Sequence, residues 1–140
     1  MSPTQHYFSN AVGSVDFAQA GGYIYLHWSG ASLTSPEFRA LYIHAHNLLR
    51  RHELTGILAD HQAMPAAPDP ADRDWLLQEW LPAVLEDTNF VRYAVLPTLE
   101  PEHRLHTPAM AKQLRRVVTT AFFDDLDEAA NWLRQPTLTK

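Results

Sequence analysis

Hydrophobic and polar residues alternate along two short segments near the N-terminus, 12–18 and 23–28. In the second segment, one face carries only large apolar side chains: Ile24, Leu26 and Trp28. An alternation with a period of two is typical of a strand that buries one face. Gly21 and Gly22 lie between the segments and favour a turn, so the two are predicted to pair as an antiparallel hairpin.

The next residues follow a helical period. From Phe38 to Leu49, apolar residues recur every three or four positions and form a single stripe. The preceding Ser-Pro-Glu at 35–37 supplies a cap-type residue, a proline and an acid, which are the usual signals of a helix start. The segment 56–60 is apolar up to its final carboxylate, and this pattern is typical of a strand buried on both faces.

The same patterns predict the remaining elements: a helix at 70–85, a strand at 91–96, a helix at 109–116, a strand at 117–123 and a helix at 126–133. Pro82 removes a backbone hydrogen bond from the first of these helices, so we expect a kink or a break there.

The order of these elements is β-β-α-β-α-β-α-β-α. It predicts an α/β fold with a five-stranded, mostly parallel sheet, an antiparallel N-terminal edge hairpin and four flanking helices. No repeat, low-complexity tract or linker divides the sequence, so residues 1–140 are expected to form one domain with an ordered core at about 12–133.

Composition narrows the possible functions. The formal charge of −5 argues against a nucleic-acid binder, and the absence of Cys excludes thiol chemistry and zinc-thiolate sites. No Gly follows Gly56, which removes the usual phosphate-binding loops, and no Ser follows Ser35. The sequence has no signal-peptide pattern and no apolar run long enough to span a bilayer, so a cytoplasmic location is expected.

Several strings resemble the STAS-like domains of the SpoIIAA-like group: Tyr25-x-x-Trp28-x-Gly30, Ile57-Leu58-Ala59-Asp60, Trp75-Leu76-x-x-x-Trp80-Leu81-Pro82, Ala94-Val95-Leu96 and Glu128-Ala129-Ala130-Asn131-Trp132-Leu133. The likeness extends from about residue 12 to residue 133. Its most specific parts are the closing Glu-Ala-x-x-Trp-Leu and the hairpin before the first helix. Because most of these residues have core character, the resemblance concerns the fold.

In the branch of this family that antagonises anti-sigma factors, the resemblance implies a phosphorylated Ser at the start of the helix that follows the buried strand. The matching segment here, 61–72, contains neither Ser nor Thr. The chain is therefore more similar to stand-alone STAS-like or SEC14-related bacterial proteins. Such a resemblance carries over a fold and not an activity.

One candidate site lies where the parallel strands end. Asp60 and His61 follow the buried strand, and the loop after the next strand supplies four more groups: Glu100, Glu102, His103 and His106. Open α/β sheets bind ligands beyond the carboxyl ends of their strands, so these groups are candidates for a ligand, metal or acid–base site. The alternative is that Asp60 caps a turn while the histidines lie in a solvated loop.

A second candidate is the helix at 70–85, whose apolar residues cover about half of its circumference. Trp75, Trp80 and Leu81, with Met64 in the preceding loop, would form a homodimer interface, a partner interface or the contact surface for an apolar ligand. The alternative is that the proline-containing loop and the first hairpin fold over this surface.

These candidates give two hypotheses. The first is a non-enzymatic STAS-like interaction module that binds itself or a protein partner through this helix and its preceding loop, with no cofactor and no catalytic residues. The second is a protein that binds an apolar or lipid-like small molecule, or a metal-assisted hydrolase, with its site at the strand ends.

Overall fold

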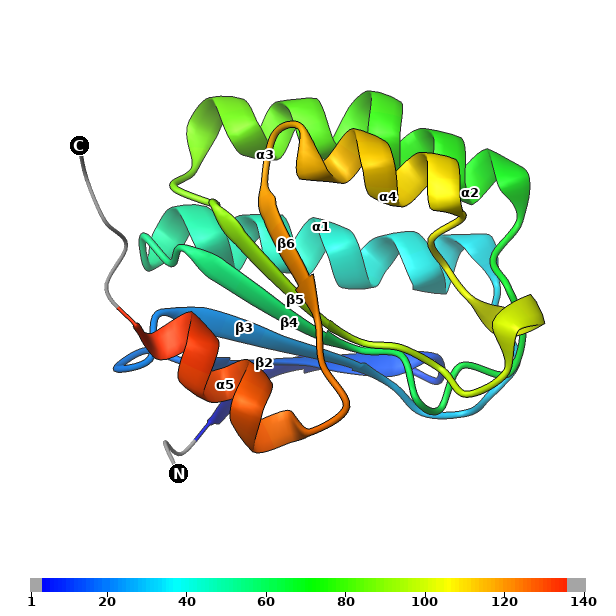
Figure 1. Cartoon of the computed structure of the whole chain (residues 1–140), viewed down its shortest axis with the longest axis horizontal. Helices are drawn as coiled ribbons and strands as arrows, with labels where there is room; N and C mark the ends of the chain where they lie inside the picture. The colour runs from blue at the N-terminus through cyan, green and yellow to red at the C-terminus, as the bar shows by residue number, and fades with distance from the viewer. Residues whose placement is uncertain (1–3, 136–140) are drawn as a thin grey trace.

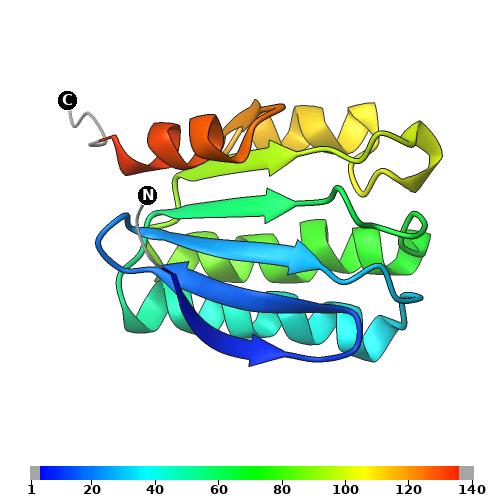
Figure 2. The same ribbon diagram turned by 90° about the horizontal axis from the view of Figure 1, so that it is seen from below.

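The computed structural model describes residues 4–135, and these build one mixed sheet with helices on both faces (Figure 1). The described strands lie side by side in chain order (Figure 2): β1 (Gln5–Ser9), β2 (Gly13–Ala18), β3 (Tyr23–Trp28), β4 (Gly56–Asp60), β5 (Arg92–Leu96) and β6 (Thr119–Phe122). β1 pairs antiparallel with β2, and β2 pairs antiparallel with β3. From β3 to β6 all pairs are parallel. The predicted α/β class and the predicted hairpin are confirmed.

The predicted number of strands is wrong, because β1 precedes the expected ordered core and adds a sixth strand at the edge of the sheet. The sequence of β1 does not show the alternation of apolar and polar residues that is typical of a strand. Tyr7 and Phe8 are adjacent apolar residues, and the register shifts between His6 and Phe8. An irregularity of this kind lets two neighbouring side chains turn toward one face, which breaks the alternation on which the prediction depended.

Three crossovers join the parallel strands. They place α1 (Ser35–Arg51), the segment α2 (Pro70–Trp75) to α3 (Leu81–Asp87), and α4 (Pro108–Arg115) over one face of the sheet. α5 (Leu126–Arg134) lies on the opposite face (Figure 1). A short 3₁₀ turn, η2 (Pro101–His103), interrupts the loop before α4. The larger apolar core fills the space under the first three of these segments, and a smaller one lies beneath α5.

The helix predicted at 70–85 is continuous but contains a π-helical turn, η1 (Leu76–Trp80). The backbone N–H of Leu81 donates to the carbonyl oxygen of Leu76, five residues earlier. Pro82 follows directly and has no N–H to donate to Gln78. The chain therefore accommodates Pro82 with a wider turn in place of a break, and π-turns of this kind occur frequently at functional sites.

Within residues 4–135, no helix is long and apolar enough to cross a membrane.

Candidate ligand-binding site at the ends of the parallel strands

The loops that follow β4 and β5 meet at the carboxyl edge of the sheet, as the sequence predicted. The backbone N–H of His61 donates to the carbonyl oxygen of Leu96 over 2.9 Å, which joins the two loops directly. The rings of His61 and His106 stack with their centroids 5.3 Å apart. Two histidines that are 45 positions apart in the sequence are thus brought into contact.

His61 is only 2% exposed, and its Nε2 atom has no hydrogen-bond partner within the described part of the chain. Its ring contacts the Trp28 ring edge-on, with centroids 4.8 Å apart. Burial lowers the pKa of His61 well below its ordinary value, and the neighbouring His106 lowers it further. The His61 imidazole is therefore neutral at physiological pH and carries a buried polar atom that can accept or donate a hydrogen bond.

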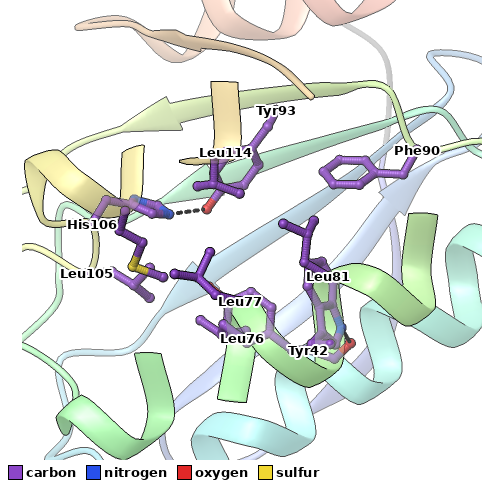
Figure 3. Close-up of a pocket in the computed structure, with 11 residues that line it drawn as sticks. Tyr42, Leu76, Leu77, Leu81, Phe90, Tyr93, Leu105, His106 and Leu114 are labelled. Carbon is purple, nitrogen blue, oxygen red and sulfur yellow. Dashed lines mark hydrogen bonds between the residues drawn. The ribbon is translucent and has the colours of Figure 1, made fainter. Parts of the chain in front are cut away.

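His106 is held by Tyr93, whose hydroxyl lies 3.2 Å from the His106 Nε2 atom (Figure 3). Burial, with a smaller contribution from the Arg73 charge, lowers the pKa of His106 to about 3. Burial also raises the pKa of Tyr93, so the phenol keeps its proton. The hydrogen bond therefore joins two neutral groups, and the His106 tautomer decides which of them donates.

Both histidines line a pocket with a volume of about 590 Å³, which we call the strand-end pocket. Its walls come from the residue after β4, from α2, from the end of β5, from the loop before α4, from α4 and from the end of β6. The polar and charged residues that line it are His61, Arg73, Thr98, Arg104, His106, Thr107 and Arg115. No acidic side chain is among its lining residues in the range 4–135, and Glu100 and Glu102 of the same loop lie exposed outside it.

Arg73 of α2 organises this pocket. Its Nε atom donates to the carbonyl oxygen of Leu105 over 2.8 Å, and its Nη2 atom donates to that of Arg104 over 2.7 Å. The side chain therefore fixes the loop before α4 against the neighbouring helix while its charge faces the pocket. Arg115 lies over the Phe122 ring, 5.4 Å from the ring centroid. Arg104 is exposed at the rim.

A second, smaller space adjoins the strand-end pocket, with a volume of about 20 Å³; we call it the apolar cavity (Figure 3). Its lining is apolar and aromatic apart from one imidazole: Tyr42, Leu76, Leu77, Trp80, Leu81, Phe90, Tyr93, Leu105, His106, Met110 and Leu114. Leu105 and His106 line both spaces. These two residues therefore form the partition between a polar compartment and an apolar one.

The other predicted strand-end residues do not join the pocket. Asp60 accepts from the Tyr25 hydroxyl over 2.9 Å and from the backbone N–H of Gln62 over 3.1 Å, so it caps a turn. His103 lies in η2, partly exposed, and lines neither the strand-end pocket nor the apolar cavity. Of the predicted groups, the structure brings together only His61 and His106.

The residues predicted to form an interface occupy different environments. Trp80 and Leu81 are buried within the chain, and the Trp80 Nε1 atom donates to the carbonyl oxygen of Tyr42 over 2.6 Å. Met64 is also buried. Trp75 is partly exposed, with the Arg39 guanidinium 5.2 Å above its ring. The interface at this helix remains a prediction, and Trp75 is its only accessible aromatic residue.

The sequence interpretation missed the three arginines. Arg73, Arg104 and Arg115 lie in a helix, a loop and a second helix, and none of them is part of a motif. Only the folded arrangement of α2 beside α4 collects them. A weak signal was present in the sequence, because Arg104 stands between the two candidate histidines, His103 and His106.

Within residues 4–135, no group of three or more His, Asp or Glu side chains is arranged to hold a metal ion. Comparisons with family models, curated proteins and solved structures give no match to this chain. The chemistry of the strand-end pocket is therefore interpreted from its own residues.

Proposed function

We propose that this protein binds a small organic anion in the strand-end pocket. The observation that carries the proposal is the charge distribution. The chain has a net charge of −5, yet Arg73, Arg104 and Arg115 line one pocket from which, in the described residues, acidic side chains are absent. Like charges gathered at one site repel one another, and an anion between them removes that repulsion and gains charge-assisted hydrogen bonds.

The neutral groups of the pocket suit the same ligand. The buried Nε2 atom of His61 lacks a partner, and an unpaired buried polar group is costly unless a ligand or water satisfies it. Thr98 and Thr107 also line the pocket and carry hydroxyl groups. A carboxylate or a phosphate monoester offers acceptors to the two hydroxyl groups and to His61 Nε2 in the tautomer that carries its proton there.

The histidines favour binding over turnover. A general acid or base works best when its pKa lies near the operating pH. Burial holds the pKa of His106 at about 3 and that of His61 well below its ordinary value. Both rings therefore act as fixed neutral dipoles in the wall of the pocket.

Thermal-shift and calorimetric titrations test this proposal. The probes are hexanoate, hexyl phosphate, phenylacetate and inorganic phosphate, with hexanamide as the uncharged counterpart of hexanoate. We expect organic anions to raise Tm and hexanamide to leave it unchanged. Comparison of the carboxylate with the phosphate ester identifies the preferred head group.

Arg104→Gln is the diagnostic variant, because Arg104 is exposed at the rim and its replacement leaves the core intact. Loss of one charge-assisted hydrogen bond should weaken anion binding about tenfold. Arg51→Gln, at an exposed position at the end of α1, is the matched control and should bind as the unmodified protein does. If no anion binds, or if both variants weaken binding equally, the proposal is wrong.

The STAS-like fold and the partner-binding role that follows from it stand as a second proposal. The element order, the antiparallel N-terminal hairpin and the partly exposed Trp75 support it. Sedimentation of the protein and of Trp75→Ala over a range of concentrations tests the interface: equal masses at every concentration would argue against a homodimer through this helix.

A further inference from the structure

The apolar cavity adds a second recognition element to the proposed anion site. It lies between η1 and α3 on one side and α4 on the other, above β5. Figure 3 shows Leu76, Leu77 and Leu81 facing Tyr93, His106 and Leu114 across it. The cavity has its own chemistry, since the His106 imidazole is the only ionisable group besides two tyrosines in a lining of apolar side chains.

We propose that the ligand is amphipathic: its anionic head lies among the arginines of the strand-end pocket, and its apolar end enters the apolar cavity beside His106. This inference rests on the proposed anion binding and names the class of ligand. The shared partition carries it. Leu105 and His106 each line both spaces, so the two spaces adjoin at these side chains, and a ligand that lies along them would extend from one space into the other.

The π-helical turn supports the same assignment. Three cavity residues, Leu76, Leu77 and Trp80, belong to η1, and Leu81 follows directly. A π-turn widens the helix and displaces the side chains that follow it. Unfilled apolar space also destabilises a fold, because its walls lose packing contacts. The apolar cavity therefore lies beside the widened part of this helix, where an apolar ligand group would add packing contacts.

The size of the cavity limits the ligand. A volume of about 20 Å³ holds about one methyl-sized group, whereas the strand-end pocket, at about 590 Å³, has room for a head group and a short chain. The ligand class is therefore an organic anion with a short alkyl or branched tail that ends in a methyl group. Long-chain anions require Leu77 or a neighbouring side chain to move.

The test is calorimetric titration with straight-chain carboxylates from butanoate to dodecanoate, together with dicarboxylates of the same lengths. Affinity should rise by up to about fourfold for each buried methylene and then stop rising once the tail fills the apolar cavity. A dicarboxylate should bind at least tenfold more weakly than the monocarboxylate of equal length, because its second charge would enter apolar surroundings.

Leu77→Ala provides the diagnostic variant, since Leu77 is only partly buried and lines the apolar cavity without lining the strand-end pocket. It should move the optimum to a longer carboxylate, and Leu77→Phe should move it to a shorter one. Leu85→Ala is the control on the same helical segment, because Leu85 is also partly buried and lines neither space.

The outcomes separate the two proposals. If the affinity for carboxylates does not depend on tail length, or if the Leu77 variants keep the same optimal chain length, the amphipathic assignment is wrong and anion binding stands. If no carboxylate or phosphate ester binds at all, the anion proposal itself fails. A shift of the optimum in Leu77→Ala but not in Leu85→Ala establishes the apolar cavity as the tail site.

Discussion

The Tyr93 hydroxyl and the His106 Nε2 atom lie 3.2 Å apart at the partition between the strand-end pocket and the apolar cavity. Tyr93 comes from β5, an interior strand of the sheet, whereas His106 comes from the loop before α4. This hydrogen bond therefore connects that loop directly to the sheet.

Tyr93→Phe removes this hydrogen bond and leaves the His106 Nε2 atom without this partner. Because the group left behind is largely buried, we expect the free energy of unfolding to fall by about 1–3 kcal/mol. Urea denaturation measures the change. Tyr7→Phe is the matched control, since Tyr7 is a partly buried tyrosine whose ring contacts His44, and it should change stability by less than about 0.5 kcal/mol. A Tyr93→Phe protein as stable as the control would show that the contact contributes nothing.

The buried His61 and the half-buried His106 predict how stability depends on pH. Their pKa values in the folded state lie below the ordinary value of 6.5, with that of His106 at about 3. Below pH 6.5 the unfolded chain binds protons at these histidines, whereas the folded chain does not. Stability from these groups is therefore complete above about pH 6.5 and is lost as the pH falls toward 3, by about 1.4 kcal/mol per pH unit for each histidine.

Denaturant unfolding at a series of pH values between 4 and 7 measures this slope, and His106→Gln isolates one contribution. The variant should show a slope that is smaller by about one proton, and His103→Gln, in the same loop and partly exposed, serves as the control for loss of an imidazole. An unchanged slope in His106→Gln would contradict the assignment of a neutral His106.

Trp80 and Trp75 allow stability to be separated from association. Trp80 is 8% exposed and donates a buried hydrogen bond to the Tyr42 carbonyl oxygen, so Trp80→Ala should lower the free energy of unfolding by about 3–5 kcal/mol. Trp75 is partly exposed, so Trp75→Ala should cost less than about 1.5 kcal/mol. Calorimetric Tm values check both, and comparable losses in the two variants would overturn this division. Binding experiments on the helix should accordingly use the Trp75 variant.

Much of the architecture follows from local patterns. The buried strand 56–60 and the start of α1 carry signals that are complete within a few residues, and the structure places both where the sequence predicted them. β1 was missed because its pairing depends on an irregular register with β2, which is a property of two segments together. Local alternation cannot reveal a strand whose own side chains do not alternate.

The burial of a polar residue such as Asp72 could not be predicted from the sequence. Asp72 is 3% exposed and accepts hydrogen bonds from Ser35 Oγ and Arg39 Nε, each over 2.8 Å. From the sequence it is one of three acids at the start of a helix, where charge complements the helix dipole. Only tertiary structure distinguishes it from its solvated neighbours, Asp69 and Asp74.

The strand-end pocket includes residues whose position follows from the element order and residues whose position depends on tertiary packing. The position of His61 and His106 at one edge follows from the rule for parallel strands, which needs only the element order. The arginines needed more information, because Arg73 reaches the pocket only through the packing of α2 beside the loop before α4. Element order thus predicted that the loops after β4 and β5 meet at one edge of the sheet, whereas the arginines that line the strand-end pocket were not predicted.

Arg73 provides the last prediction, because it combines a structural role with a charge. Its two hydrogen bonds to the carbonyl oxygens of Leu105 and Arg104 require the planar, forked guanidinium group. Lysine keeps the positive charge but cannot reproduce this geometry. Arg73→Lys should therefore leave the loop from Pro97 to Thr107 less firmly held, and its backbone amides should exchange hydrogen about tenfold faster, since each lost bond is worth about 1 kcal/mol or more.

Hydrogen-exchange mass spectrometry of the peptides that cover this loop measures the effect, and Arg104→Lys is the control that changes a neighbouring arginine without removing either bond. If the proposed anion also contacts Arg73, the affinity of Arg73→Lys should fall even though the charge is retained, because the head group meets a displaced loop. Unchanged exchange in Arg73→Lys would show that the loop is held by its prolines and by Leu105 in the core, and that Arg73 contributes only its charge to the strand-end pocket.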